Sequence, residues 1–97
     1  MQNIFNMNPL EQEELAVLEE VQTSEMLDLI VFNDDVNTFE HVINTLVKIC
    51  GHTIEQAEQC SMIIHYKGKC SVKRGAFEEL KPMHQGICEN GISAEIL

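Results

Sequence analysis

Tryptophan is absent from the 97-residue chain, and only six lysines and arginines stand against sixteen aspartates and glutamates. The formal net charge is −10. Because phosphate contacts need clustered Lys and Arg, this scarcity of positive charge argues against nucleic acid as a partner. No apolar run approaches the roughly 20 residues of a membrane span. The N-terminus has neither the basic residue nor the apolar stretch of a secretory signal. We therefore expect a cytoplasmic protein with no membrane association.

Metal-binding spacings of cysteine and histidine are also missing. The sequence has no CxxC and no HxxxH, and Cys50 and His52 form its one close pair, which is not a standard zinc spacing. The sequence therefore predicts no metal site. Thiols are kept reduced in the cytosol, so we expect the cysteines to be buried small hydrophobes rather than disulfides: Cys50, Cys60, Cys70 and Cys88.

Acidic residues concentrate in the first half of the chain. Residues 1–47 hold ten of them and no Lys or Arg. The segment before residue 25 has only scattered aliphatics, so it can bury little apolar surface. We interpret residues 1–24 as an acidic, mobile N-terminal arm and residues 25–97 as the folded domain. Asn8, Pro9 and Glu11 are typical of a helix start, but so short a helix is stable only when something packs against it.

The body begins with residues 26–33, an apolar, β-branched run that predicts a buried strand. A helix follows. Asn37 or Thr38 is its expected cap, with Glu40 completing an Asn-x-x-Glu box, and Gly51 stands in the C′ position. The apolar residues in between have helical spacing: Phe39, Val42, Ile43, Leu46, Val47 and Cys50.

The second half of the body changes period twice. Thr53 and Gln56 open a second helix, and residues 66–73 then alternate as a strand with one solvated face. A third helix runs from Phe77 towards Gly91, with a distortion or late start at Pro82, and residues 92–96 form a closing strand. The predicted fold class is α+β, a small βααβαβ sandwich in which helices cover one face of a three-stranded antiparallel sheet.

The most unusual local feature is the loop Asn33-Asp34-Asp35 directly before a helix start. Carboxylates there commonly complement the helix dipole. The alternative is acid/base chemistry or a hard metal, but no third carboxylate follows at a ligand spacing. A Cys–His nucleophile pair remains open, and His65 by itself is an ordinary residue at a helix-to-strand junction.

Two separated strings carry a family resemblance. Leu29–Asp35 reads LIVFNDD and Ile64–Lys69 reads IHYKGK, with a helix rich in aliphatics between them. Together they resemble the ClpS adaptor family, which delivers proteins with destabilising N-terminal residues (N-degrons) to a AAA+ Clp protease. The resemblance covers about residues 25–97 and implies a monomeric, non-enzymatic adaptor that needs no cofactor. The body would dock on the N-terminal domain of the Clp ATPase, and the acidic arm would reach into that ATPase.

The resemblance also implies a binding site. The family's ligands for the substrate α-amine fall on Asn33, Asp34 and His65, and the aspartate that shapes the site falls on Asp35. A protonated amine needs acceptors of partial or full negative charge, which these side chains supply. The implied pocket for the first side chain is lined by Val31, Asn37, Phe39, Val42, Ser61, Ile64 and Ile92.

The chain departs from the family pattern at that pocket. Val36-Asn37-Thr38 replaces the usual Tyr-Thr-Pro, and Phe39 and Ser61 stand where the family usually has methionine. Which first residues are accepted is therefore open. Two alternatives remain: a family member with an occluded degron pocket that regulates the Clp ATPase, and a small Cys- or metal-dependent enzyme.

Overall fold

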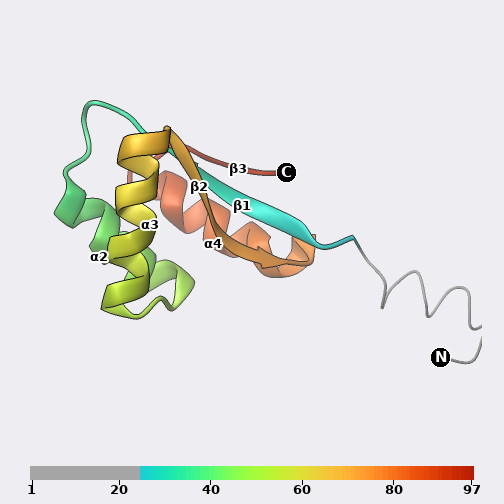
Figure 1. The fold of residues 1–97 in the computed structure, drawn as a ribbon. Coiled ribbons are helices and arrows are strands. Elements are labelled where there is room, and N and C mark those ends of the chain that lie inside the picture. The colour runs from blue at the N-terminus through green and yellow to red at the C-terminus, as the bar shows by residue number, and fades with distance from the viewer. Residues whose placement is uncertain (1–24) are drawn as a thin grey trace, which may run out of the picture.

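The computed structural model describes residues 25–97; the expected arm, residues 1–24, and the helix start at Asn8 lie outside the described residues. Within residues 25–97, three strands and three helices follow one another in the predicted βααβαβ order (Figure 1). The elements are β1 (Leu27–Phe32), α2 (Phe39–Cys50), α3 (Ile54–Lys67), β2 (Lys69–Gly75), α4 (Phe77–Glu89) and β3 (Ala94–Ile96).

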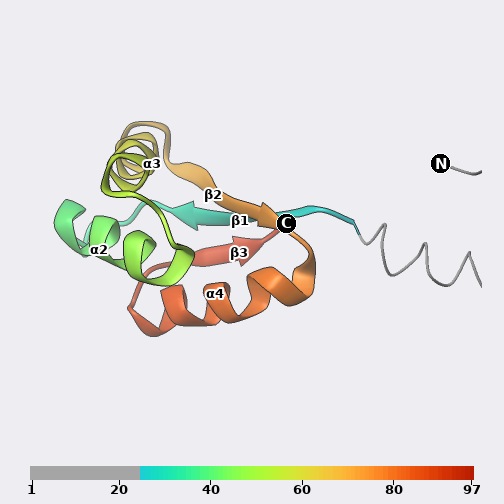
Figure 2. The ribbon, with the colours of Figure 1, turned by 90° about the horizontal axis from the view of Figure 1, so that it is seen from below.

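The three strands form one antiparallel sheet with β1 in the centre, in the order β2-β1-β3 (Figure 2). Val31 of β1 pairs with Cys70 on one side and with Ala94 on the other. The register with β2 shifts between Leu29 and Ile30. The last paired residue of β1 is Phe32, opposite Lys69, so the loop that follows β1 leaves the sheet beside the end of α3.

One face of the sheet is apolar and covered, and the other is solvated, with polar residues and the half-buried Ile30 and Phe32. Leu29 and Val31 alternate onto the covered face and are fully buried. Asp28 belongs to the polar face, where its carboxylate accepts 2.8 Å hydrogen bonds from Ser71 Oγ and Arg74 Nη1. An antiparallel sheet tolerates one solvated face. The predicted α+β sandwich with helices on one face is therefore confirmed.

The core lies between the sheet and the helices. Its buried apolar residues come from all six elements and from the turn before β3: Leu29, Val31, Leu46, Cys50, Ala57, Ile64, Val72, Leu80, Ile87, Ile92 and Ala94. Within residues 25–97, no helix is long and apolar enough to cross a membrane.

The helix starts are set by local polar contacts. Thr38, one of the two expected caps, begins α2: its Oγ1 accepts a 3.0 Å hydrogen bond from the His41 N–H. The expected Asn-x-x-Glu box is wrong, because the Asn37 side chain is bound to Asp34 and to the Gly91 carbonyl instead. At α3 the Thr53–Gln56 capping box is present as predicted.

Two boundaries differ from the sequence prediction. The strand expected from residue 66 starts only at Lys69, because α3 continues to Lys67 and ends on Gly68. Gly68 has φ 94°, a left-handed conformation that a side chain would strain, and its N–H closes the helix on the Ile64 carbonyl. Pro82 does not delay α4, which begins at Phe77 and contains the proline.

The cysteines are all free thiols, but they are not all buried. Cys50 is buried, Cys60 and Cys70 are half-buried, and Cys88 is exposed on α4, so the expectation of four buried cysteines is wrong for Cys88. Burial raises the pKa of the Cys50 thiol to about 11 and that of Cys70 to about 12. These two thiols therefore stay protonated at neutral pH.

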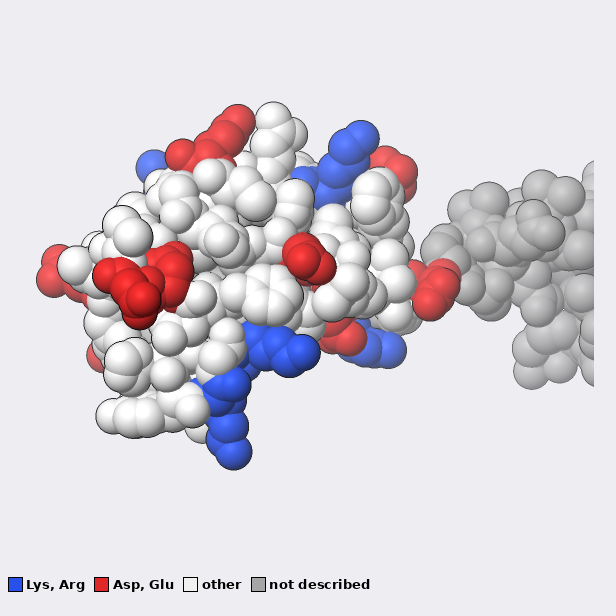
Figure 3. All heavy atoms as spheres, turned by 90° about the horizontal axis from the view of Figure 1, so that it is seen from above, with Lys and Arg blue, Asp and Glu red and all other residues white. Residues whose placement is uncertain are grey.

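Charge is unevenly spread over the surface. Figure 3 shows a group of acidic side chains at the end of the molecule that carries the start of α2, whereas elsewhere on this face acidic side chains lie beside basic ones, as Asp28 does beside Arg74. A cationic ligand is therefore favoured at the acidic end.

The core assignment predicts a large cost for truncating Leu80, which is fully buried on α4. We expect Leu80→Ala to lower the free energy of unfolding by about 2–5 kcal/mol, because a lost side chain leaves a cavity in a close-packed core. Urea denaturation followed by circular dichroism measures the change. The exposed neighbour Lys81 supplies the control, since Lys81→Ala should stay within about 0.5 kcal/mol. Equal effects of the two substitutions would show that α4 does not pack as described.

Candidate functional site

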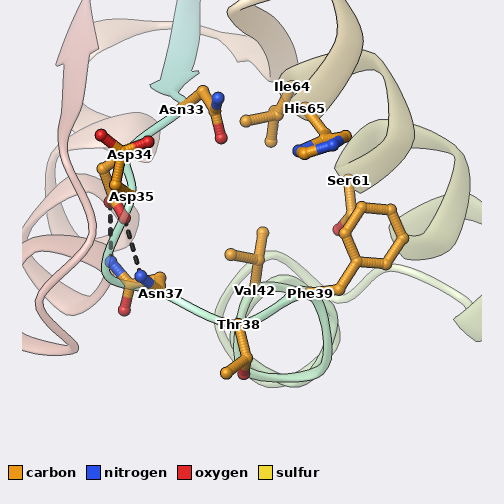
Figure 4. A pocket seen from close by; sticks show the side chains of 10 residues that line it. All are labelled: Asn33, Asp34, Asp35, Asn37, Thr38, Phe39, Val42, Ser61, Ile64 and His65. Carbon is orange, nitrogen blue, oxygen red and sulfur yellow. Dashed lines mark hydrogen bonds between the residues drawn. The ribbon is translucent and has the colours of Figure 1, made fainter.

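A pocket of about 380 Å³ opens where the loop after β1 faces the start of α2 and the last two turns of α3 (Figure 4). Seven of the ten residues that line it are polar. They are Asn33, Asp34, Asp35, Asn37, Thr38, Ser61 and His65; the apolar ones are Phe39, Val42 and Ile64. The pocket therefore combines an apolar wall with an unusual number of hydrogen-bonding groups.

A single backbone hydrogen bond brings the two sides of this pocket together. The Asn33 N–H donates to the Gly68 carbonyl at 2.9 Å. Gly68 directly follows α3, and His65 lies in the last turn of that helix. The end of β1 is thus tied to the end of α3, and the Asn33 and His65 side chains face the same pocket (Figure 4).

Asp34 organises the loop between β1 and α2. Its Oδ1 accepts from the backbone N–H groups of Val36 and Asn37 at 2.8 and 2.7 Å, and its Oδ2 accepts from Asn37 Nδ2 at 2.7 Å. The bonds from the backbone and side chain of Asn37, more than the one from Val36, hold the pKa of this carboxyl below its ordinary value. Asp34 is therefore ionised at neutral pH. A carboxylate oxygen has two acceptor positions, so Oδ2 keeps one for a ligand.

Asn37 locks the same loop to the far end of the chain. The Nδ2 atom that binds Asp34 also donates to the Gly91 carbonyl at 2.9 Å, just before β3 (dashed lines in Figure 4 mark the bonds to Asp34). His41 repeats this link one turn into α2, since its Nε2 lies 2.8 Å from the Asn90 carbonyl. The pocket wall is thus fixed by polar contacts from two directions.

His65 and Asp35 are the exposed charged or titratable groups of the pocket. The His65 ring meets Phe39 edge-on with ring centroids 6.1 Å apart, and it meets Tyr66 at 4.9 Å. These contacts fix the orientation of the ring. Neither ring nitrogen is engaged by another residue within the described range 25–97, so both are available to a ligand. Asp35 borders the pocket with an exposed carboxylate.

Nine of the eleven expected positions line one pocket: Asn33, Asp34, Asp35, Asn37, Phe39, Val42, Ser61, Ile64 and His65. Val31 and Ile92 do not line it. Both are buried in the hydrophobic core, 0% and 3% exposed. Thr38 lines the pocket and was expected only as a helix cap; its place directly before α2 was the available signal.

The fold and site define a small α+β domain with a polar, acidic binding pocket at the end of its central strand. Residues 22–94 match the family model for the ATP-dependent Clp protease adaptor protein ClpS. The chain belongs to the ClpS family, a family of Clp protease adaptors associated with proteolysis.

Curated relatives agree with this assignment, and each of the three described here is an ATP-dependent Clp protease adapter protein ClpS. The one from Lawsonia intracellularis is 38% identical over 64 residues, which are 63% of this chain and 59% of the relative. The one from Erwinia tasmaniensis is 38% identical over 70 residues, 70% of this chain and 66% of the relative. The one from Sodalis glossinidius is 32% identical over 80 residues, which are 77% of this chain and 76% of the relative. The match therefore spans less than two thirds of the length of the first two relatives.

The loop geometry makes a prediction about Asp34. Asn37→Ala removes the side-chain donor to Oδ2, so we expect the pKa of the Asp34 carboxyl to rise towards its ordinary value. Carboxyl-carbon NMR titration between about pH 2 and 6 measures it. Since the folded-state pKa is the lowered one, this carboxylate stabilises the fold above its unfolded pKa, and that contribution is lost as pH falls through the folded value.

The matched control for this titration is Asn44→Ala, which removes an exposed amide on α2 outside the pocket. The control should leave the Asp34 titration unchanged. An unchanged Asp34 pKa in Asn37→Ala would contradict the described loop.

Proposed function

We propose that this protein binds N-degrons, meaning the free α-amine and apolar first side chain of a substrate protein, and delivers them to a AAA+ Clp ATPase for degradation. The observation that carries the proposal is the joining of Asn33 and His65 at the rim of one pocket that also presents Asp34 and Asp35. Family membership establishes the coarser role of Clp protease adaptor.

The rim groups suit a protonated amine. An α-amine has a pKa near 8, so it is mostly charged at neutral pH and offers three donors. Asn33 Oδ1, an unprotonated ring nitrogen of His65 and the remaining acceptor position of Asp34 Oδ2 can take one hydrogen each. The carboxylates of Asp34 and Asp35 favour the charged amine over a neutral group. An internal residue offers no such cation, so the pocket would select chain termini.

The deeper part of the pocket suits one side chain. Val42 and Ile64 provide apolar contact, and the volume of about 380 Å³ is at the small end of ligand pockets. Phe39, at the position where the family usually has methionine, is 43% exposed and stands at the side of the opening without filling it. The pocket is open in this conformation, which favours degron binding over the alternative of an occluded regulator.

Delivery completes the proposed role. We infer that the folded body docks on the N-terminal domain of the Clp ATPase and that the acidic segment, residues 1–24, engages the ATPase. The protein acts as a cytoplasmic monomer, without a cofactor and without catalysing a reaction. The curated relatives are called Clp protease adapter proteins, which supports a partner of this kind.

The rival hypothesis is a thiol enzyme. The structure does place a cysteine beside a histidine, but this histidine cannot act as the base for the thiol. Cys88 Sγ lies 3.6 Å from His84 Nε2, and that same nitrogen lies 2.9 Å from the Ala94 carbonyl. A carbonyl only accepts, so Nε2 carries the hydrogen and cannot take the thiol proton. Among residues 25–97, no group of three His, Cys, Asp or Glu side chains is placed to hold a metal ion. The adaptor is the better-supported function.

The amine requirement supplies the test. A peptide that starts with a free apolar residue should bind, and its N-acetylated form should bind at least about tenfold more weakly, because a charge-assisted hydrogen bond contributes about 1.5–3 kcal/mol. Asn33→Ala should weaken the binding of the free peptide by a similar factor, and it keeps the backbone hydrogen bond to Gly68. Fluorescence anisotropy with labelled peptides measures both effects.

Asn44→Ala removes an amide on α2 away from the pocket and should leave the affinity unchanged. Equal affinity of free and acetylated peptides would overturn the proposed function.

A further inference from the structure

One polar group of the pocket is left without a partner. Ser61 is 2% exposed, lies on the α3 wall of the pocket, and its buried Oγ makes no hydrogen bond within the described residues. Figure 4 shows it on that wall, below His65 in this view. A buried hydroxyl without a partner is unfavourable, and native structures usually satisfy such groups.

A second buried hydroxyl in the same protein shows that a buried helical hydroxyl need not lack a hydrogen-bond partner. Thr45 of α2 is also buried, and its Oγ1 donates to the His41 carbonyl one turn earlier at 2.8 Å. Serine and threonine commonly bind the helix backbone in this way. Ser61 has the same option towards the Ala57 carbonyl and does not use it. Its hydroxyl therefore remains able to form a hydrogen bond with a ligand in the pocket.

We propose that Ser61 is a specificity-determining residue that selects a first side chain with a hydroxyl at its tip, so that an N-terminal tyrosine is preferred to an N-terminal phenylalanine. This inference rests on the proposed function, because it gives a role to Ser61 in the same pocket, that of binding the tip of the first side chain. The ligand class is a peptide with a free amine at one end of its first residue and a phenolic hydroxyl at the other.

The spacing along α3 fits this ligand. His65 and Ser61 are four residues apart on one face of the helix, which places them about 6 Å apart along its axis. A tyrosine whose amine lies at Asn33 and His65 would thus extend its ring past Ile64 and Val42 and bring its hydroxyl to Ser61. Serine or threonine as a first residue is too short to reach that depth.

Hydrogen bonding to Ser61 favours tyrosine over phenylalanine as the first residue. A phenylalanine in the same position would leave the Ser61 hydroxyl unpaired, as it is in the free protein, whereas tyrosine satisfies it and its own hydroxyl together. Sites that hydrogen-bond a substrate hydroxyl reject the analogue that lacks it, far more strongly than apolar pockets reject an added one. The half-exposed Phe39 ring borders the same wall, so it can shift to admit the ligand.

The experiment compares two peptides that differ only in the first residue, tyrosine or phenylalanine, by fluorescence anisotropy on the full chain. We expect the parent protein to bind the tyrosine peptide about tenfold more tightly, the effect of one satisfied buried hydrogen bond. Ser61→Ala should remove the preference by weakening the binding of the tyrosine peptide to the level of the phenylalanine peptide. Ser93→Ala, an exposed serine outside the pocket, should keep it.

Equal affinities in the parent protein, or a preference that survives in Ser61→Ala, would overturn the inference. The comparison of the two peptides on the parent protein remains valid even if Ser61→Ala folds poorly. Thermal unfolding shows whether the variant is folded. The acetylated tyrosine peptide separates the two hypotheses. If acetylation has no effect, the proposed function fails; if the free amine is needed but tyrosine and phenylalanine bind alike, only the role of Ser61 fails.

Discussion

The site depends on one backbone hydrogen bond, from the Asn33 N–H to the Gly68 carbonyl. It extends the pairing of β1 with β2 by one step beyond Phe32 and Lys69 and fixes the loop after β1 to the end of α3. Gly68 makes this possible, because its left-handed conformation ends the helix and turns the chain into β2 at once. Two of the three candidate contacts to a substrate amine follow from that junction, since Asn33 and His65 belong to its two sides.

Electrostatics and polar contacts then give the pocket its character. Asp34 is held ionised by Asn37 and Val36, and Asn37 in turn reaches the Gly91 carbonyl, so the negative charge at the rim sits on a braced loop. In a chain with a net charge of −10, such a rim attracts a cation rather than a phosphate. The apolar wall adds contact area, and the unpaired Ser61 hydroxyl adds a polar group inside it.

Much of this was predictable from the sequence, because local signals and the tertiary structure agree. Thr53 and Gln56 cap α3, Gly51 ends α2, and alternating Leu29 and Val31 face the core. The prediction failed where one local signal outweighed another: alternation suggested a strand from residue 66, but α3 continues to Lys67 and is ended by the left-handed Gly68. Sequence position also could not tell that Val31 and Ile92 point into the core, since lining a pocket depends on the depth of a side chain below the surface.

The most direct test of the account is a crystal structure of the protein with a peptide that carries a free amine on an apolar first residue. The account predicts that the amine nitrogen lies within hydrogen-bonding distance of Asn33 Oδ1 and a His65 ring nitrogen, with the first side chain between Val42 and Ile64. A peptide bound elsewhere, such as the shallow groove on the outer side of α3 lined by Met62 and Tyr66, would contradict it.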